Sequence, residues 1–346
     1  LDPQFYMPHA DHSRLCSHDY WPANYQTGAF FQSPALAQLI AKLHEQNIHL
    51  GCRDFILPGI LAERIDDDWL EIQRLILEEA RSLDSKLDLY STIALSSDCL
   101  RDDQQVAELI ESANEWKAPG YYLVCEHPKG TYFVDDSVWV ANVLDLIAGL
   151  RMSGSKVIVG YCNQQMLTAA LAKANAICSG TWMNVRFFSG EKFWQAYDEE
   201  VRQRSTWYYC PQALSEYKIH FLGSASKLNV LSIMAPDAIY DDQYVATLFQ
   251  DARGVSVGIT EQASFRHYLS CLHKQVKLAD ASSFDDAVIL HAARLQTAKG
   301  LLSQLSQKGI KGQNRDYSEI IDVDEVAIEV FKSTRGPTLR RQWSQL

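Results

Sequence analysis

Eight short apolar runs, most of them followed by an amphipathic segment, constrain the fold of this chain more than any other feature. Several runs are continuously apolar rather than alternating, which is typical of parallel strands buried on both faces. The segments between them repeat apolar residues at steps of three and four, which places these residues on one helical face. The eight runs comprise residues 4–7, 54–57, 88–94, 121–125, 156–161, 176–179, 219–222 and 238–240.

Strand and helix in alternation predict right-handed βαβ units and a parallel sheet. Helical spacing is clearest over residues 106–116 and 140–150, and a shorter stripe covers residues 166–171. Eight such units predict an α/β fold of the (β/α)8 TIM-barrel type. An open doubly wound sheet is the alternative, but the chain contains neither Gly-x-Gly-x-x-Gly nor a Walker phosphate loop.

The pattern changes after about residue 245. Residues 260–310 carry helical stripes and no further strand-like run. The sequence therefore predicts a barrel over residues 1–245, with an insertion of helix and loop around 187–217. Residues 246–346 form the predicted helical C-terminal extension, which ends in a basic tail.

The net charge of −11 argues against a surface coated with phosphate-binding groups. One local basic patch remains, because residues 332–346 hold Lys332, Arg335, Arg340 and Arg341 without an acid. This tail and the helical extension are candidate contacts for a protein partner or nucleic acid, or a solvated terminus.

The distribution of apolar residues and cysteines bears on the environment of the protein. No apolar run approaches 18 residues, so we expect no membrane span. Eight cysteines are spread evenly and none forms a Cys-x-x-Cys pair. This favours reduced core cysteines and a cytoplasmic protein over a disulfide framework.

Polar residues gather where the predicted strands end, and in a barrel these ends face the active-site mouth. Glu126 follows the fourth run and is a candidate proton shuttle. Asp241 and Asp242 follow the eighth run, where a carboxylate can act as nucleophile or base, or as a helix N-cap. The candidate substrate-binding residues are Tyr161, Asn163, Gln164, Gly180, Arg186 and Ser224.

A group of imidazoles lies near the start of the chain. His9, His12 and His18, with Cys16, place four nitrogen or sulfur donors within ten residues. Such donors bind zinc, although this spacing matches no strong zinc signature. The primary expectation is therefore a protein without a cofactor, and a zinc site here is the alternative.

Residues 219–241 follow a pattern seen in one known family. The chain reads Ile-His-Phe-Leu-Gly-Ser over 219–224 and Asp-Ala-Ile-Tyr-Asp over 237–241, separated by a short apolar segment. This resembles the last two strands of the tRNA-guanine transglycosylase superfamily, which includes relatives acting on 7-deazaguanine bases in DNA. The opening Leu-Asp-Pro-Gln-Phe is similar to the family's Asp-Ser-Gly-Gly-Phe.

The resemblance implies a role for several residues. Asp241 would be the nucleophile that attacks the ribose anomeric carbon, and Asp2 the general acid/base. Asn163 or Gln164 would read the base edge, and Gly180 would lie near the base-binding loop. The family's paired glycines are replaced by Ser179-Gly180-Thr181, and its Cys-x-Cys-x-x-Cys zinc site has no counterpart.

Three hypotheses follow for the function. The first is a transglycosylase-like enzyme that handles a purine or 7-deazapurine base, free or in nucleic acid, through Asp241, with Glu126 or Asp2 moving the proton and Arg186 orienting substrate. The second is a non-catalytic barrel that serves as a scaffold or binding subunit. The third is a metal-dependent hydrolase that uses His9 and His12 with a strand-end carboxylate.

Overall fold

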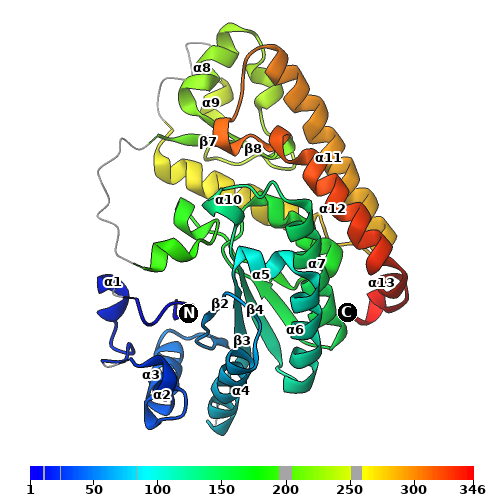
Figure 1. Ribbon diagram of the computed structural model, residues 1–346. Coiled ribbons are helices and arrows are strands. Elements are labelled where there is room, and N and C mark those ends of the chain that lie inside the picture. Colours follow the sequence, from blue (N-terminus) through cyan, green and yellow to red (C-terminus); the bar gives the residue numbers. More distant parts are fainter. Residues whose placement is uncertain (11, 24, 84, 195–204, 251–258) are drawn as a thin grey trace.

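The centre of the protein is a parallel β-sheet, seen in a computed structural model that describes all residues except 11, 24, 84, 195–204 and 251–258 (Figure 1). The strand order is β1-β3-β4-β5-β6, and β2 pairs with the far end of β3. The strands are β1 (Asp54–Ile56), β2 (Leu61–Ala62), β3 (Asp88–Leu95), β4 (Gly120–Cys125), β5 (Lys156–Val159) and β6 (Ala176–Ile177).

The predicted closed eight-fold barrel is wrong. The sheet is open and strongly curled, and forms about half of a barrel. Five of the predicted runs contain strands of this sheet, namely those at 54–57, 88–94, 121–125, 156–161 and 176–179. Residues 4–7 are not assigned to a strand, although the Leu61 amide donates to the Tyr6 carbonyl at 2.9 Å.

The last two predicted strands are replaced by other structure. Residues 219–222 begin helix α8 (Ile219–Lys227), and residues 238–240 form a turn. In α8 the buried residues are Leu222 and Ala225, which are three positions apart and share one helical face. A four-residue apolar run cannot by itself distinguish a strand from a buried helical turn.

Helices pack against one face of the sheet, which we call the outer face (Figure 1). Side chains alternate across β4, so that the Tyr121 hydroxyl donates to the Ala113 carbonyl on the outer face, while Tyr122 points to the inner face. Asp102 and Asp136 start their helices by accepting backbone N–H groups. The helices that flank the sheet are α3 (Pro34–His49), α4 (Asp67–Ser82), α5 (Ser97–Arg101), α6 (Asp103–Trp116) and α7 (Ser137–Met152).

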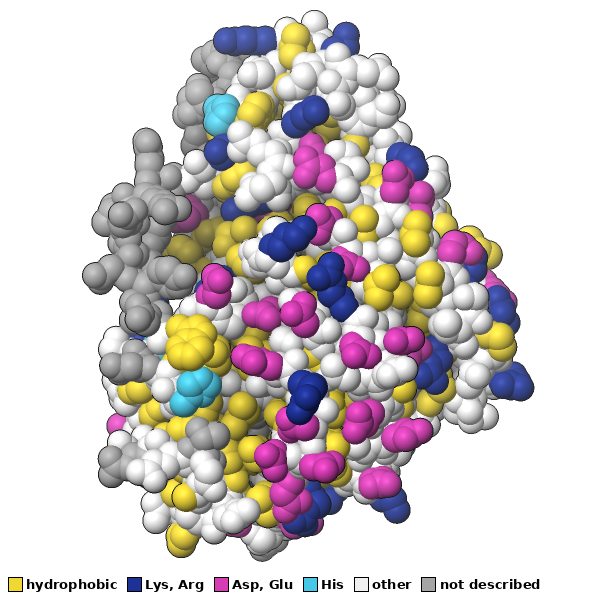
Figure 2. Space-filling model, viewed as in Figure 1, with side chains coloured by type: hydrophobic (Ala, Val, Ile, Leu, Met, Phe, Trp, Pro, Cys, Tyr) yellow, Lys and Arg dark blue, Asp and Glu magenta, His cyan; other side chains and the backbone are white. Residues whose placement is uncertain are grey.

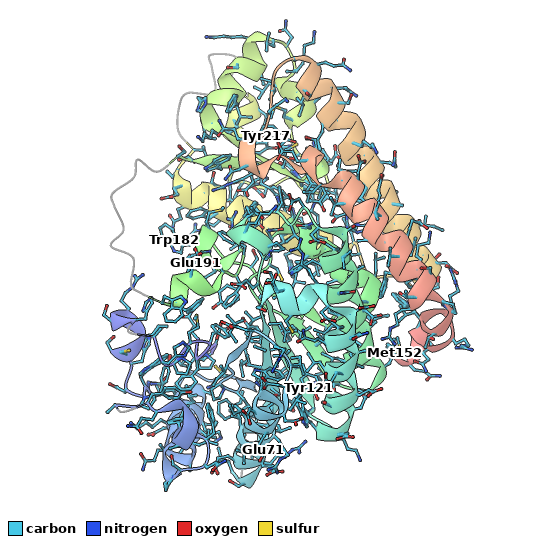
Figure 3. All side chains as sticks on the ribbon, in the orientation of Figure 1. Glu71, Tyr121, Met152, Trp182, Glu191 and Tyr217 are labelled. Atoms are coloured by element: carbon cyan, nitrogen blue, oxygen red, sulfur yellow. The ribbon has the colours of Figure 1, made fainter. Side chains whose placement is uncertain are left out.

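A second group of elements lies beyond the sheet. The predicted insertion at 187–217 lies partly outside the described residues. Its described parts contain the 3-10 turn η4 (Gly190–Phe193) and an antiparallel pair, β7 (Trp207–Cys210) and β8 (Ser215–Lys218). Tyr217 on β8 lies in the upper half of the molecule and Tyr121 on β4 in the lower half (Figure 3). The upper half also contains α8, α9 (Ala246–Gln250) and α10 (Glu261–Lys277).

The described part of residues 246–346 is helical. Helices α11 (Phe284–Gln307) and α12 (Ile321–Thr334) run side by side from the upper half to α13 (Gly336–Gln342), which lies near the C-terminus (Figure 1). None of the helices that the structure describes is long and apolar enough to span a membrane.

The basic tail is packed rather than a solvated terminus. Arg335 makes a bidentate ion pair with Asp145 of α7, and Arg340 pairs with Asp285 of α11. Acidic side chains gather on the face shown in Figure 2, over α4 and α6. Three of the four tail cations are therefore paired with acids, since Lys332 also pairs with Glu329, and the Arg335–Asp145 pair holds the extension to the rest of the protein.

A buried carboxyl group on α12 forms a hydrogen bond with the segment that follows β5. Asp324 accepts from the Gln165 side chain at 3.0 Å and from the Tyr317 hydroxyl. Gln165 lies in the 3-10 helix η2 (Gln164–Ala172), which follows β5. Burial raises the pKa of the Asp324 carboxyl from 3.8 to about 7, and the two hydrogen bonds only partly offset this.

We expect Asp324 to make stability fall as the pH rises through neutrality. Between these two pKa values the Asp324 carboxyl is protonated in the folded protein but ionised in the unfolded chain. The free energy of unfolding of the wild type should therefore fall by about 3 kcal/mol between about pH 5 and 8. Asp324→Asn should lack this loss, and Asp322→Asn, an exposed position on the same helix, should keep it. Denaturant titrations at the two pH values measure the free energy of unfolding of each protein. An equal fall with pH in all three proteins would refute the prediction.

Candidate functional site

The N-terminal segment places Asp2 against the inner face of the sheet, and in Figure 1 the N-terminus lies beside β2. The Tyr6 hydroxyl lies 2.8 Å from both carboxyl oxygens of Asp2. The Tyr161 hydroxyl donates to Oδ2 at 3.0 Å and the Tyr122 hydroxyl at 3.3 Å. Three tyrosines, from the N-terminal segment, from β4 and from just after β5, therefore surround one carboxyl group. We call these four residues the Asp2 cluster.

Two residues beside this carboxyl have left-handed backbone conformations. Gln4 has φ of 54° and Tyr161 has φ of 55°. The Gln4 amide donates to Asp2 Oδ1 at 2.9 Å, and its side-chain amide donates to the Tyr161 hydroxyl at 3.1 Å. Positive φ is uncommon outside glycine, and such strained residues concentrate at functional sites. Their presence on both sides of Asp2 favours a functional role for this cluster.

Burial governs the protonation of the Asp2 cluster. Burial raises the pKa of the Asp2 carboxyl above 3.8, although hydrogen bonds from Gln4 and the three tyrosines act in the opposite direction. Burial and the nearby Asp2 charge raise the pKa of Tyr6, Tyr122 and Tyr161 well above 10, so these groups remain hydroxyl donors. Asp2 is therefore the member of the cluster that is suited to give and take a proton, while the tyrosines serve as hydrogen-bond donors.

Aromatic rings line one side of the Asp2 cluster. Phe188 and Phe193 stack with ring centroids 5.2 Å apart. Tyr6 contacts both rings edge to face at 5.0 and 5.1 Å, and Tyr161 contacts Phe188 at 5.3 Å. These buried rings pack against one another and make the side of the cluster that they line apolar.

Gly160 leaves the space that Tyr122 needs to reach Asp2. A Cβ atom at Gly160 would lie 2.3 Å from the Tyr122 hydroxyl oxygen and 2.5 Å from its ring carbon. We expect Gly160→Ala to lower the free energy of unfolding by about 1–3 kcal/mol, because the core around Tyr122 has no room for a methyl group. Gly300→Ala, on an open face of α11, should be neutral or raise it by up to about 1 kcal/mol. Chemical denaturation checks both, and an unchanged Gly160→Ala protein would contradict the packing.

Glu126 has a structural role at the end of β4. Its Oε1 accepts from the Gly190 amide at 2.8 Å and its Oε2 from the Ser97 amide at 3.2 Å. Both carboxylate oxygens therefore anchor backbone segments, one at the start of α5 and one in η4. This arrangement accounts for an acid at this position without a proton-shuttle role.

Four predicted substrate-binding residues use their polar groups inside the protein. Asn163 begins η2 by accepting from the Gln165 amide, and the Gln164 side chain bonds to Leu214 and Tyr132. The buried Arg186 donates to the Gly180 carbonyl at 2.8 Å and pairs with Glu216 at 3.1 Å. Of the six predicted substrate-binding residues, Tyr161 is the one placed in the Asp2 cluster.

Ser224 and Asp241 lie elsewhere. Ser224 is exposed on α8, because the predicted seventh strand is a helix. Asp241 is exposed on the turn that precedes α9, and its carbonyl accepts from Lys274 at 2.9 Å. Neither position is at a strand end, since the strands predicted to precede them are absent from the described sheet.

The N-terminal histidines have separate structural contacts. His12 Nδ1 accepts from the Leu15 amide at 3.3 Å, which caps helix α1 (Ser13–Cys16). His9 packs edge-on against Trp194, and His18 stacks on Tyr20 at 5.2 Å. Among the described residues they do not form a group of three metal-ligand side chains.

Two members of the Asp2 cluster, Asp2 and Tyr161, were among the residues predicted from the sequence, and Tyr6 and Tyr122 were not. Tyr6 and Tyr122 lie inside predicted strands, where an apolar run hides their hydroxyl groups. Tyrosines within strands that are expected to be buried could have pointed to the cluster, because a buried tyrosine hydroxyl needs a hydrogen-bond partner. Two neighbouring tyrosines in one strand point to opposite faces, so each requires its own partner.

Comparisons with models of protein families, with curated proteins and with solved structures give no match to this chain. The fold and the Asp2 cluster define an α/β protein with an open, curled parallel sheet and a half-buried carboxyl on its inner face. What this carboxyl does is inferred from its geometry and from the sequence resemblance.

Proposed function

We propose that this protein breaks and remakes the bond between a purine-like base and its sugar, with Asp2 as the general acid and base. The observation that carries the proposal is the Asp2 carboxyl held by three tyrosine hydroxyls on the inner face of the sheet. A base leaves a sugar more easily when its nitrogen is protonated, and a carboxyl with a raised pKa can supply that proton. The sequence resemblance assigns the same role to Asp2.

The proposed reaction has two steps. In the first, the bond between the sugar C1′ and the base nitrogen breaks, Asp2 gives its proton to the leaving base, and a nucleophile bonds to C1′. In the second, an incoming base attacks C1′, the nucleophile leaves, and the proton of the incoming base returns to Asp2. The resemblance names Asp241 as the nucleophile, but Asp241 lies on the exposed segment before α9 and is not a member of the Asp2 cluster, so the identity of the nucleophile is left to experiment. Water in its place would give hydrolysis instead of exchange.

The surroundings of Asp2 suit a flat and uncharged group. Phe188, Phe193 and the Tyr6 ring offer aromatic contacts, whereas the buried cation Arg186 is already paired with Glu216. We therefore place the base, rather than a phosphate, beside Asp2. Contacts with the rest of a nucleic acid would come from other parts of the surface.

The test is base exchange with the full chain. Guanine and 7-deazaguanine, each labelled with tritium, are incubated separately with the protein and tRNA, duplex DNA or free guanosine, and label in the polymer or nucleoside is counted. Release of free base from each acceptor is followed by chromatography without added base. The proposal predicts incorporation with at least one acceptor, or release of free base if water is the nucleophile. Neither incorporation nor release with any acceptor would overturn it.

A non-catalytic binding subunit is the second candidate. It is favoured by Glu126, Gln164 and Arg186, whose polar groups hold the protein together instead of facing a ligand. This candidate predicts that labelled tRNA or DNA binds the protein in a fluorescence-anisotropy titration without any base exchange. Binding that depends on the acid–base state of Asp2 would argue for the enzyme.

A further inference from the structure

Three metal-ligand side chains meet at α10, away from the Asp2 cluster. His267 and Cys271 are one helical turn apart and share a face of α10, and Asp242 lies on the turn before α9. Their ligand atoms all lie within 4.8 Å of one another. The His267 and Cys271 side chains are fully buried and that of Asp242 is nearly so. In the part of the chain that the structure describes, this is the one group of its kind.

The hydrogen bonds of His267 suit a metal ligand. Its Nε2 donates to the Tyr209 carbonyl at 2.9 Å, and Tyr208 stacks on the ring at an interplanar angle of 15°. If Nε2 carries the hydrogen of a neutral ring, Nδ1 presents a lone pair to the Asp242 carboxylate, 2.8 Å away. Two facing lone pairs require a cation, either a second proton or a metal ion. Metal-binding histidines usually donate their other N–H to a carbonyl or carboxylate in this way.

The distances can accommodate a tetrahedral ion. Ligand bonds of about 2.0–2.3 Å imply ligand atoms about 3.3–3.7 Å apart around zinc. Cys271 Sγ lies 3.6 Å from both ring nitrogens of His267, so its side chain would have to turn toward Nδ1 to share an ion with it. Asp242 would move outward by about half an ångström, which its turn permits more readily than a helix would.

We propose that Asp242, His267 and Cys271 bind one zinc ion. Oxygen, nitrogen and thiolate sulfur together form a donor set that zinc accepts, and three protein ligands leave a fourth position for water. The thiol would lose its proton to the solvent as the metal binds. Metal-free Cys271 stays protonated, because burial raises the pKa of its thiol.

The ion would fasten the turn before α9 to α10. Lys274, one turn beyond Cys271, also holds this turn by donating to the Asp241 carbonyl at 2.9 Å. Zinc would therefore fix the backbone next to Asp241, the residue that the sequence resemblance names as nucleophile. The zinc site itself does not depend on the proposed function.

The test uses Co²⁺ as the probe. Metal-free full-length protein is titrated with Co²⁺ and then with Zn²⁺, and absorption is recorded. We expect one equivalent of Co²⁺ to produce a thiolate-to-cobalt charge-transfer band that Zn²⁺ abolishes. Cys271→Ser should lose this band, and Asp242→Asn should weaken Co²⁺ binding at least tenfold. Cys99→Ser, another buried cysteine outside the group, should behave as the wild type.

The variants also distinguish this site from another metal site or from misfolding. Circular dichroism establishes whether each protein is folded. If Cys271→Ser does not fold, the Co²⁺ affinity of Asp242→Asn decides the question. A wild type without the band would overturn the proposal. So would a band that persists in folded Cys271→Ser, or Co²⁺ affinity unchanged in Asp242→Asn.

Discussion

Replacing Glu216 with glutamine should lower the free energy of unfolding by about 3–5 kcal/mol, because it leaves two buried guanidinium groups without their counter-ion. Glu216 lies 3.1 Å from Arg186 and 2.9 Å from Arg315, and the Tyr132 hydroxyl donates to it at 2.9 Å. Burial alone would raise the pKa of this carboxyl, but Arg315 and Arg186 outweigh burial and hold it below 4.5.

The control for Glu216→Gln is a pair on the surface. Glu78 forms an ion pair with Arg74 on the exposed side of α4. Glu78→Gln should therefore change the free energy of unfolding by less than about 1 kcal/mol. Denaturant titration at neutral pH measures both variants. Similar losses in the two proteins would show that burial of the Glu216 network contributes little.

Asp2→Asn should reduce base exchange by about 10²–10⁴-fold, the usual contribution of a positioned acid or base. Asparagine preserves the shape of the side chain but cannot transfer the proton, and its NH2 group replaces one oxygen that accepts hydrogen bonds in the Asp2 cluster. Because burial disfavours the charged form of Asp2, the neutral substitution should not lower stability. The exchange rate and the unfolding midpoint are measured on the same preparation.

Two further variants separate the roles of the acids. Asp54→Asn, an exposed position at the start of β1, should leave exchange unchanged. Asp241→Asn should abolish exchange if Asp241 is the nucleophile. If Asp2→Asn loses base exchange while Asp241→Asn keeps full activity, Asp2 remains the general acid and base, and Asp241 is excluded as the nucleophile. Full activity in Asp2→Asn would contradict the central role of Asp2.

Among the strands that the sequence predicted correctly, β4 is buried at every position, whereas β1, β5 and β6 are partly exposed. Residues 121–125 read as a continuous apolar run because helices cover one side of the sheet and the N-terminal segment covers part of the other. The runs at 219–222 and 238–240 failed because their length fits a helical turn or a loop equally well. Closure of the barrel depended on these two runs.

The polar residues at strand ends were overinterpreted for a related reason. The chain must satisfy the backbone groups of its connecting segments, and Glu126 and Asn163 do so by accepting N–H groups. Residues that hold backbone segments and residues that catalyse reactions are of the same types, and both occur at the ends of strands. The sequence alone does not separate them. Asp2 differs in having hydroxyl partners from three separate segments, which the sequence could not place together.

The most direct test of the account is the pKa of Asp2 itself. Protein labelled with ¹³C at the aspartate carboxyls is titrated by NMR, and the Asp2 resonance is identified by its absence in Asp2→Asn. The account predicts a midpoint above the ordinary value of 3.8, because burial outweighs the four hydrogen bonds to the carboxyl. A midpoint at or below 3.8 would mean that Asp2 is a stabilised carboxylate, and it would contradict its role as the general acid.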